Sequence, residues 1–165
     1  MERKEELNTF SFFCKLSFKV TKTSNQFPVN EVVFGEKIGD NLYKIHNSPF
    51  FTFGYSYLDI VVTENNSEYP YPLIIYKNQE SGHSTYRILR NPNIDFDVFN
   101  KFWLILEKMG CSYESDDKLL SVDIPLNIDI NRIYELLMEG EESDTWTFEE
   151  AHVSDFHRKK IKTNR

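Results

Sequence analysis

The spacing of hydrophobic and polar residues predicts a first half made of short strands. Apolar side chains recur at short intervals in stretches that are bounded by Gly, Pro, Asn and Asp. The run Gly39-Asp40-Asn41 suits a hairpin turn, because these residues tolerate a positive φ. Consecutive short antiparallel strands favour a curled sheet or a small barrel. The strand-like stretches are residues 10–20, 31–50, 57–64, 72–78 and 84–90.

After residue 93 the pattern changes to amphipathic helices that alternate with strands. Asp95 or Asp97 can cap a first helix, whose apolar residues follow the i, i+3, i+4, i+7 spacing, and Gly110 is placed to end it. A second helix begins near Asp129, and we expect Gly140 to close it. Alternating apolar residues predict two further strands, at residues 119–125 and 145–153.

Counted from the strand at 84–90, the second half has the order β-α-β-α-β, which is most of a ferredoxin-like arrangement. The predicted fold class is α+β: an N-terminal antiparallel, strand-rich curled sheet or small barrel, joined to a ferredoxin-like βαβαβ half with two helices on one sheet face. We divide the chain into a strand-rich subdomain at 1–83, a ferredoxin-like subdomain at 84–153 and a basic, flexible tail at 154–165.

The composition agrees with a folded protein. Of the 165 residues, 40% are hydrophobic and 15% are aromatic, which is enough to build a packed interior. No apolar run is long enough to span a bilayer, and the charged N-terminus lacks the apolar centre of a secretion signal. We therefore expect a cytoplasmic protein without membrane association, in which Cys14 and Cys111 stay reduced.

Charge is distributed unevenly along the chain. The net charge is −7, yet residues 107–150 hold 13 acidic and three basic side chains, whereas residues 156–165 hold five basic side chains and no acid. An acidic body disfavours binding to nucleic acid, because phosphate binding needs a positive field. It favours a basic protein partner, or it is only a solvated face. The sequence leaves these two interpretations, and the oligomeric state, open.

Catalytic and metal-binding patterns are weak. In 79-QESGHSTYRILR-90, His83 and Ser84 are adjacent, so in a strand they point to opposite faces and cannot pair, and Ser81-Gly82 suits a turn into that strand. The neighbouring acids Glu149 and Glu150 diverge for the same reason. The four histidines lack metal-ligand spacing, and there is no glycine-rich phosphate loop. We expect no metal site, no cofactor and no enzymatic activity.

Several short motifs together resemble a known family. In order they are 39-GDNLYKIHNSPFF-51, 81-SGHSTYRIL-89, 109-MGCSYE-114, 119-LLSVDIP-125 and 146-WTFEEA-151. The series resembles the uncharacterised bacterial family called domain of unknown function 4265, over about residues 29–153. The chain departs from the family pattern at His46, where Asp is found, and at His83, where Asn is usual. The resemblance implies an architecture and brings no reaction, cofactor or substrate.

The function that we predict is protein binding. Acidic loops would face a basic partner, as in an immunity or antitoxin protein that neutralises a basic toxin such as a nuclease, and the aromatic stretch 49-PFFTFGYSY-57 would supply further contacts unless it is buried core. The predicted contact residues are Tyr55, Tyr57, Glu114, Asp116, Asp117, Glu141, Glu142 and Asp144.

Two alternatives remain from the sequence. The first is a sensor for a small anionic ligand, bound by His46, His83, Tyr86 and Arg87. The second is an enzyme, for example a hydrolase, assembled from His83, Arg87 and a carboxylate.

Overall fold

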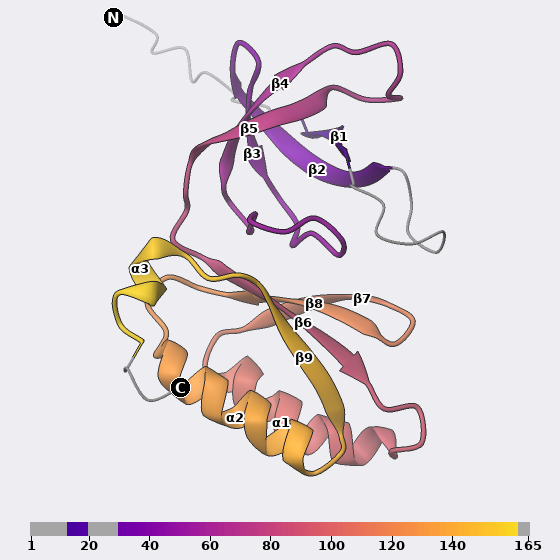
Figure 1. The fold of residues 1–165 in the computed structure, drawn as a ribbon, viewed down its shortest axis with the longest axis vertical. Helices are drawn as coiled ribbons and strands as arrows, with labels where there is room; N and C mark the ends of the chain where they lie inside the picture. Colours follow the sequence, from indigo (N-terminus) through magenta and orange to yellow (C-terminus); the bar gives the residue numbers. More distant parts are fainter. Residues whose placement is uncertain (1–12, 20–29, 162–165) are drawn as a thin grey trace, which may run out of the picture.

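The first half of the chain forms a small closed barrel, drawn uppermost in Figure 1. The computed structural model describes residues 13–19 and 30–161. Consecutive strands pair antiparallel, and β1 meets β5 in parallel between Ser17 and Leu73, which closes the barrel. Asn41 makes the β2–β3 turn with a φ of 57°. The strands are β1 (Phe13–Lys19), β2 (Asn30–Gly39), β3 (Leu42–Ile45), β4 (Ile60–Glu64) and β5 (Leu73–Gln79).

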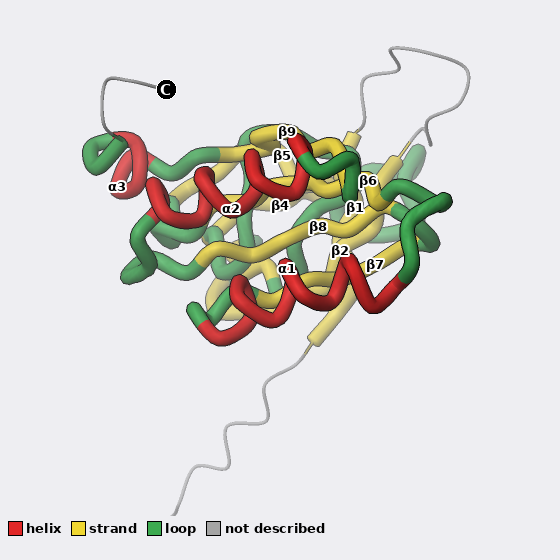
Figure 2. Tube along the Cα trace, turned by 90° about the horizontal axis from the view of Figure 1, so that it is seen from below, coloured by secondary structure: helices red, strands yellow, loops and turns green. Residues whose placement is uncertain are grey.

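The second half is a four-stranded sheet covered by helices on one face (Figures 1 and 2). The strand order is β7-β8-β6-β9 and all neighbours are antiparallel, so the chain order β-α-β-β-α-β gives a complete ferredoxin-like arrangement. The predicted α+β class is therefore confirmed. The elements are β6 (Ser84–Arg90), α1 (Phe96–Lys108), β7 (Ser112–Asp116), β8 (Leu119–Ile124), α2 (Ile130–Glu142), β9 (Trp146–His152) and α3 (Asp155–Arg158).

Strand β7 was not expected, and it completes the predicted βαβαβ order. Its sequence is SYESD, and only Tyr113 is apolar and partly buried, where its ring packs at 4.4 Å from that of Trp103 in α1. An edge strand pairs on one side only, so it can be built from polar residues that show no hydrophobic alternation. The turn into β8 is made by Asp117, whose φ is 54°.

The helix starts follow the predicted caps, and one of the two predicted ends is wrong. The Asp95 side chain accepts the Asp97 N–H and the Asp129 side chain accepts the Asn131 N–H. Gly140 does not close α2: it lies inside the helix, where an added Cβ would come within 2.2 Å of the Trp146 ring. Close packing of the helix on this indole explains the glycine. The helix continues to Glu142.

The sheet is lined on its second face by the loop between β3 and β4, residues 46–59. Three sheet side chains donate hydrogen bonds to carbonyl groups of this loop: Ser121 to Pro49 at 2.8 Å, Arg87 to Thr52 at 2.7 Å and Thr85 to Tyr55 at 3.2 Å. The aromatic stretch 49–57 is therefore neither a strand nor a free patch. It connects the barrel to the sheet.

The loop is also fixed from the barrel side. Glu31 of β2 is buried, and its carboxylate accepts the backbone N–H groups of Phe50, Phe51 and Thr52. One carboxylate thus satisfies consecutive donors that would otherwise be buried without partners.

The first part of the segment predicted as a flexible basic tail is helical. Ser154 caps α3 by accepting the His157 N–H, and His157 is fully buried. The chain is described as far as Ile161, whose side chain packs against the core of the second half. The last four positions of the predicted tail lie outside the described residues.

Candidate functional site

Five of the predicted partner-binding carboxylates lie at one end of the sheet, away from the barrel, in two turns on either side of the end of β6. The β7–β8 turn and the α2–β9 turn both flank the end of β6 there, since Arg90 N–H donates to Lys118 O and Asn91 N–H donates to Thr145 O, each at 3.0 Å (Figure 1). We call these carboxylates the acidic end: Asp116, Asp117, Glu141, Glu142 and Asp144.

The acidic end has no paired cation among residues 13–19 and 30–161, since none of the salt bridges there includes its carboxylates. Its internal partners are neutral: Asp144 accepts a hydrogen bond from the Asn91 amide at 3.1 Å, and Glu141 accepts the Phe148 N–H at 3.4 Å. Arg90, at the same end, lies over the Phe96 ring at 6.0 Å.

Two of these acids also stand where a helix disfavours them. Glu141 and Glu142 are in the last turn of α2, which contains no basic residue. The C-terminal end of a helix carries a partial negative charge, so a carboxylate there costs about 0.3–1 kcal/mol. Their position at the end of the helix is therefore unfavourable for the fold.

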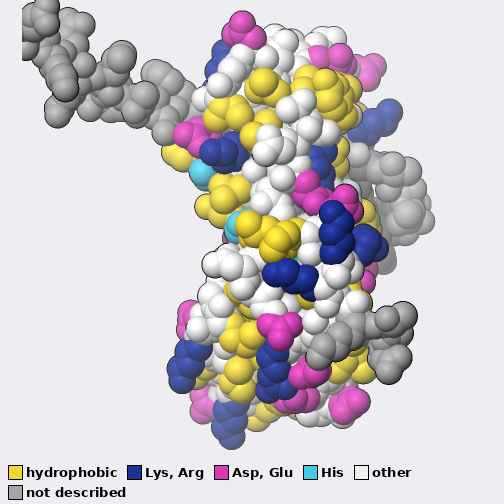
Figure 3. Space-filling model, turned by 90° about the vertical axis from the view of Figure 1, so that its left-hand side faces the viewer, with side chains coloured by type: hydrophobic (Ala, Val, Ile, Leu, Met, Phe, Trp, Pro, Cys, Tyr) yellow, Lys and Arg dark blue, Asp and Glu magenta, His cyan; other side chains and the backbone are white. Residues whose placement is uncertain are grey.

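The acidic excess does not extend over the whole second half. On the face shown in Figure 3, acidic and basic side chains alternate over the lower part, while two histidines lie at mid-height among hydrophobic side chains.

Glu114 lies apart from the acidic end, further along β7. It faces the same side of the sheet as Asp116, and its carboxylate accepts the Ser48 N–H at 3.1 Å. Loss of hydration raises the pKa of Glu114, as does the nearby carboxylate of Glu31, while the hydrogen bond from Ser48 opposes the rise.

The two tyrosines predicted as contacts have different surroundings. Tyr55 packs against the barrel core, with its ring 4.7 Å from that of Phe18, and burial raises its pKa. Tyr57 lies between His46 and His83, with ring centroids at 5.8 and 5.7 Å. Tyr57 is therefore grouped with titratable side chains, whereas Tyr55 is part of the apolar barrel core.

Each histidine beside Tyr57 is held by a carboxylate. His46 Nε2 lies 3.0 Å from Glu36 Oε2, and His83 Nδ1 lies 2.8 Å from Asp123 Oδ1. Such a hydrogen bond fixes the orientation of an imidazole ring and leaves its second nitrogen for another partner. The row His46, Tyr57 and His83 reaches from the barrel to the sheet, because His46 follows β3 and His83 precedes β6.

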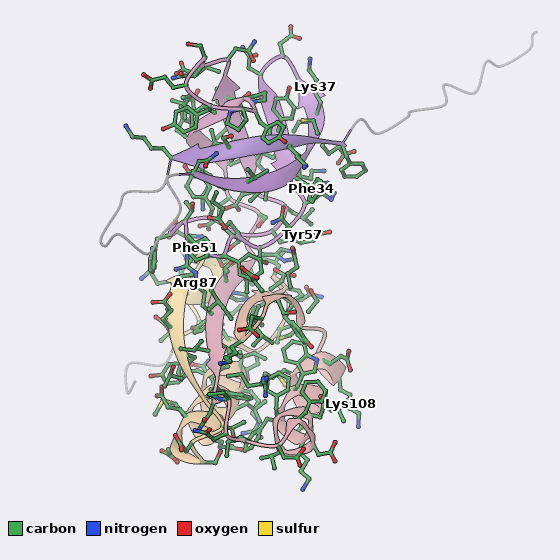
Figure 4. The ribbon with its side chains drawn as sticks, turned by 90° about the vertical axis from the view of Figure 1, so that its right-hand side faces the viewer. Phe34, Lys37, Phe51, Tyr57, Arg87 and Lys108 are labelled. Atoms are coloured by element: carbon green, nitrogen blue, oxygen red, sulfur yellow. The ribbon has the colours of Figure 1, made fainter. Side chains whose placement is uncertain are left out.

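The alternative ligand-binding set does not converge. Tyr86 is buried in the core under the helices, and its hydroxyl donates to Glu150 Oε1 at 2.6 Å. Arg87 points to the opposite face of the sheet, where it donates to Glu149 Oε1 at 2.9 Å. Figure 4 places Arg87 and Tyr57 on opposite sides of the junction between the halves.

A charged cluster that the sequence did not reveal joins the two halves. Lys77 Nζ lies 2.8 Å from the buried Asp59 and 3.2 Å from His152 Nε2, and the same histidine nitrogen lies 2.9 Å from Glu80 Oε1. Burial lowers the pKa of His152, and so does Lys77, against the opposite influence of Asp59 and Glu80. We call Asp59, Lys77, Glu80 and His152 the junction cluster.

A second unforeseen group is a buried serine–histidine pair. Ser84 Oγ lies 2.7 Å from His157 Nδ1, and Ser84 also accepts the Ser154 N–H at 3.0 Å. Burial lowers the pKa of His157. All three side chains are fully buried, so the pair attaches α3 to the start of β6 and is not exposed to a substrate. The turn interpretation of Ser81-Gly82 agrees, since Gly82 has a φ of 86° and β6 begins at Ser84.

The described residues contain no group of three or more His, Cys, Asp or Glu side chains that could hold a metal ion. None of their helices is both long enough and apolar enough to cross a bilayer. Cys14 and Cys111 are free thiols, and burial raises the pKa of Cys111 to about 12.

The family named domain of unknown function (DUF4265) matches residues 31–148. The chain belongs to this family. The match includes the loop at 46–59 as well as most of the sheet, so the two halves form part of one family unit.

Two individual proteins are similar. The chain is 30% identical over 81 residues to mouse L-aminoadipate-semialdehyde dehydrogenase-phosphopantetheinyl transferase; the match covers 44% of this chain and 26% of that protein. A hypothetical protein from Neisseria gonorrhoeae, known from a crystal structure, has a similar fold, with a TM-score of 0.72 and 19% identity, covering 87% of this chain and 96% of the other. The second likeness supports the fold alone.

Proposed function

We propose that this is a non-enzymatic protein-binding protein whose acidic end contacts a basic partner. The kind of protein that we have in mind is an immunity or antitoxin protein that neutralises a basic toxin, such as a nuclease. The observation that carries the proposal is the placement of unpaired carboxylates at one end of the sheet, at a cost to the fold.

Electrostatics explains what such an end would do. Exposed carboxylates with no internal cation present a field that attracts a basic surface and speeds its encounter. Without a partner these carboxylates contribute little to stability, since water already hydrates them. Lys or Arg side chains of a partner would reduce the repulsion of the carboxylates with each other and with the C-terminal end of α2.

The groups that could be catalytic support the non-enzymatic part of the proposal. Ser84 and His157 are closed off by α3, and Arg87 is held by Glu149 and the Thr52 carbonyl. These side chains are engaged in holding the fold, whereas none of the carboxylates of the acidic end forms a salt bridge within residues 13–19 and 30–161.

The test is capture of a partner with the tagged full chain from cells of its source, at low and at high salt. We expect a basic protein to be retained at low salt and lost at high salt, because screening weakens exposed charge contacts. The triple variant Asp116→Asn/Asp117→Asn/Glu142→Gln should lower the affinity for this protein at least about tenfold. Asn is suitable at position 117, because it tolerates the positive φ.

A matched control has the same change of charge at the other end of the molecule. Asp40→Asn/Glu64→Gln/Glu68→Gln alters exposed residues of the barrel loops, at the top of Figure 1, and should leave the affinity unchanged. Equal losses in the two triple variants would mean that net charge alone matters. Retention of the partner by both variants would contradict a role for the acidic end.

A further inference from the structure

We propose that the outer edge of β7 binds an extended basic segment of the partner by strand addition. The inference rests on the proposed function and names the contact by which the partner would be held. Strand β7 is the terminal strand in the order β7-β8-β6-β9, and it pairs only with β8 within the described part of the chain.

The backbone of β7 is accessible. Four of its five residues are exposed, and β7 lies at the rim of the sheet in Figure 1. An edge strand carries unpaired N–H and C=O groups that can form a ladder with another extended chain. Proteins that do not use such an edge commonly protect it with lysine, and β7 contains no basic residue.

The side chains of β7 define the chemistry of the incoming strand. Residues 114 and 116 face the barrel side and are both acidic, while Tyr113 on the other face packs against Trp103. Directly opposite residues in neighbouring strands lie about 4.5–5.5 Å apart, so two side chains of an added strand would stand opposite Asp116 and Glu114, the latter also accepting the Ser48 N–H, and a third would stand opposite Ser112. A segment that alternates Lys or Arg with apolar residues fits this pattern.

The acidic face continues beyond one end of β7. There the turn leads through Asp117 into the acidic end, whereas at the other end Ser112 is paired with Asp123, which is buried and holds His83. A basic segment running along β7 toward the turn would therefore meet Asp116 and then the acidic end. This continuity, together with the open backbone, favours a basic strand over a second copy of the same acidic edge, because like charges directly opposite each other repel.

The opposite edge of the sheet is a poor alternative. Strand β9 also carries acids, but Glu149 is paired with Arg87 at 2.9 Å and Glu150 accepts the Tyr86 hydroxyl. Gly54 N–H also donates to Ala151 O at 3.0 Å, so the loop already occupies part of that strand's backbone.

The experiment uses the full chain, labelled with ¹⁵N, and an acetylated, amidated peptide of sequence Lys-Thr-Lys-Val-Lys-Thr-Lys. Binding should slow amide hydrogen exchange in residues 112–116 and leave residues 146–152 unchanged. Two further peptides carry N-methyl groups on one or the other alternate set of backbone amides. Methylating the set that faces β7 should weaken binding at least about tenfold, and methylating the other set should leave it within about twofold.

Variants of the protein provide a second measurement. Glu114→Gln/Asp116→Asn should weaken peptide binding about tenfold, while Glu64→Gln/Glu68→Gln in the barrel should not. Equal binding of the two methylated peptides would overturn strand addition and leave charge-driven binding at the acidic end intact. Protection of β9 in place of β7, or a peptide-independent dimer formed through β7, would also overturn it. Failure of the proposed function would be seen in a different experiment, in which the partner is retained equally by the wild-type chain and by the triple variant of the acidic end.

Discussion

The two ends of the sheet use charge in opposite ways. At the end beside the barrel, Asp59 is fully buried and bound by Lys77 together with the backbone N–H groups of Ser56 and Ser81. At the acidic end, the carboxylates are unpaired with any described cation and most are exposed. The first arrangement is needed to hold two halves together, and the second leaves charge available to another molecule.

The contrast shows why counts of acidic residues say little about function. A buried carboxylate with several donors is costly to disturb, because removing one partner leaves the others buried without compensation. An exposed carboxylate can be neutralised at almost no cost to the fold. The energetic consequence of each substitution therefore distinguishes structural acids from acids that are free to bind.

The largest effect is expected at the junction cluster. Asp59→Asn should lower the free energy of unfolding by about 3–5 kcal/mol, because it removes the closest counterion of the partly buried Lys77 and the buried carboxylate that accepts the Ser56 and Ser81 N–H groups. Urea unfolding followed by circular dichroism measures the change. Asp116→Asn is the matched control at the acidic end, and it should shift the free energy by less than about 0.5 kcal/mol. Equal losses for the two variants would contradict the distinction between the ends.

A smaller effect on the free energy of unfolding is expected from a change of pH. Because the pKa of His152 in the folded protein is lowered from its ordinary value of 6.5, the unfolded chain takes up a proton more readily than the folded one. Stability from this group is present above pH 6.5 and is lost as the pH falls through the lower, folded-state pKa. His152→Gln should reduce the slope of unfolding free energy against pH between 7 and 5, and His157→Asn should reduce it independently, since the pKa of His157 is also lowered. A slope unchanged in both variants would contradict the burial of neutral imidazoles.

The smallest effect has the opposite sign. Glu142→Gln should raise the free energy of unfolding by about 0.3–1 kcal/mol, because it removes a negative charge from the C-terminal end of α2. Thermal and urea unfolding of the variant measure this gain. Glu135→Gln, which removes one of the two exposed carboxylates paired with Arg132 in the same helix, should not raise the free energy of unfolding. A loss of stability in Glu142→Gln would show that this carboxylate serves the fold.

The alternating and helical patterns were sufficient to predict most elements. Caps at Asp95 and Asp129 were visible because short acidic side chains stand directly before apolar helical spacing. Strand β7 could not be predicted, since its sequence is polar on both faces. The misplaced end of α2 has a tertiary cause, because only the position of the Trp146 ring explains Gly140.

The acidic end and the junction cluster also differ in how far the sequence predicts them. The acidic end could be predicted in part, because each of its two turns is a short run of acidic residues, Asp116-Asp117 and Glu141 to Asp144, although only the fold brings the two runs to the same end of the sheet. The junction cluster was not, because Asp59, Lys77 and His152 are far apart along the chain and only the docking of two sheets brings them together. His157 stands in a basic segment that suggests a free tail, and its burial depends on Ser84 and Ser154, which the sequence does not mark as partners.

The loop at 46–59 has a consequence for how this protein can change over time. Its carbonyl groups serve side chains of the sheet, while Glu31 of the barrel holds its N–H groups, so one connection belongs to both architectures at once. A gene rearrangement that transplanted the sheet alone would remove the acceptor of Ser121 and leave Arg87 with Glu149 only. We therefore expect the barrel and the sheet to be exchanged between proteins together rather than singly.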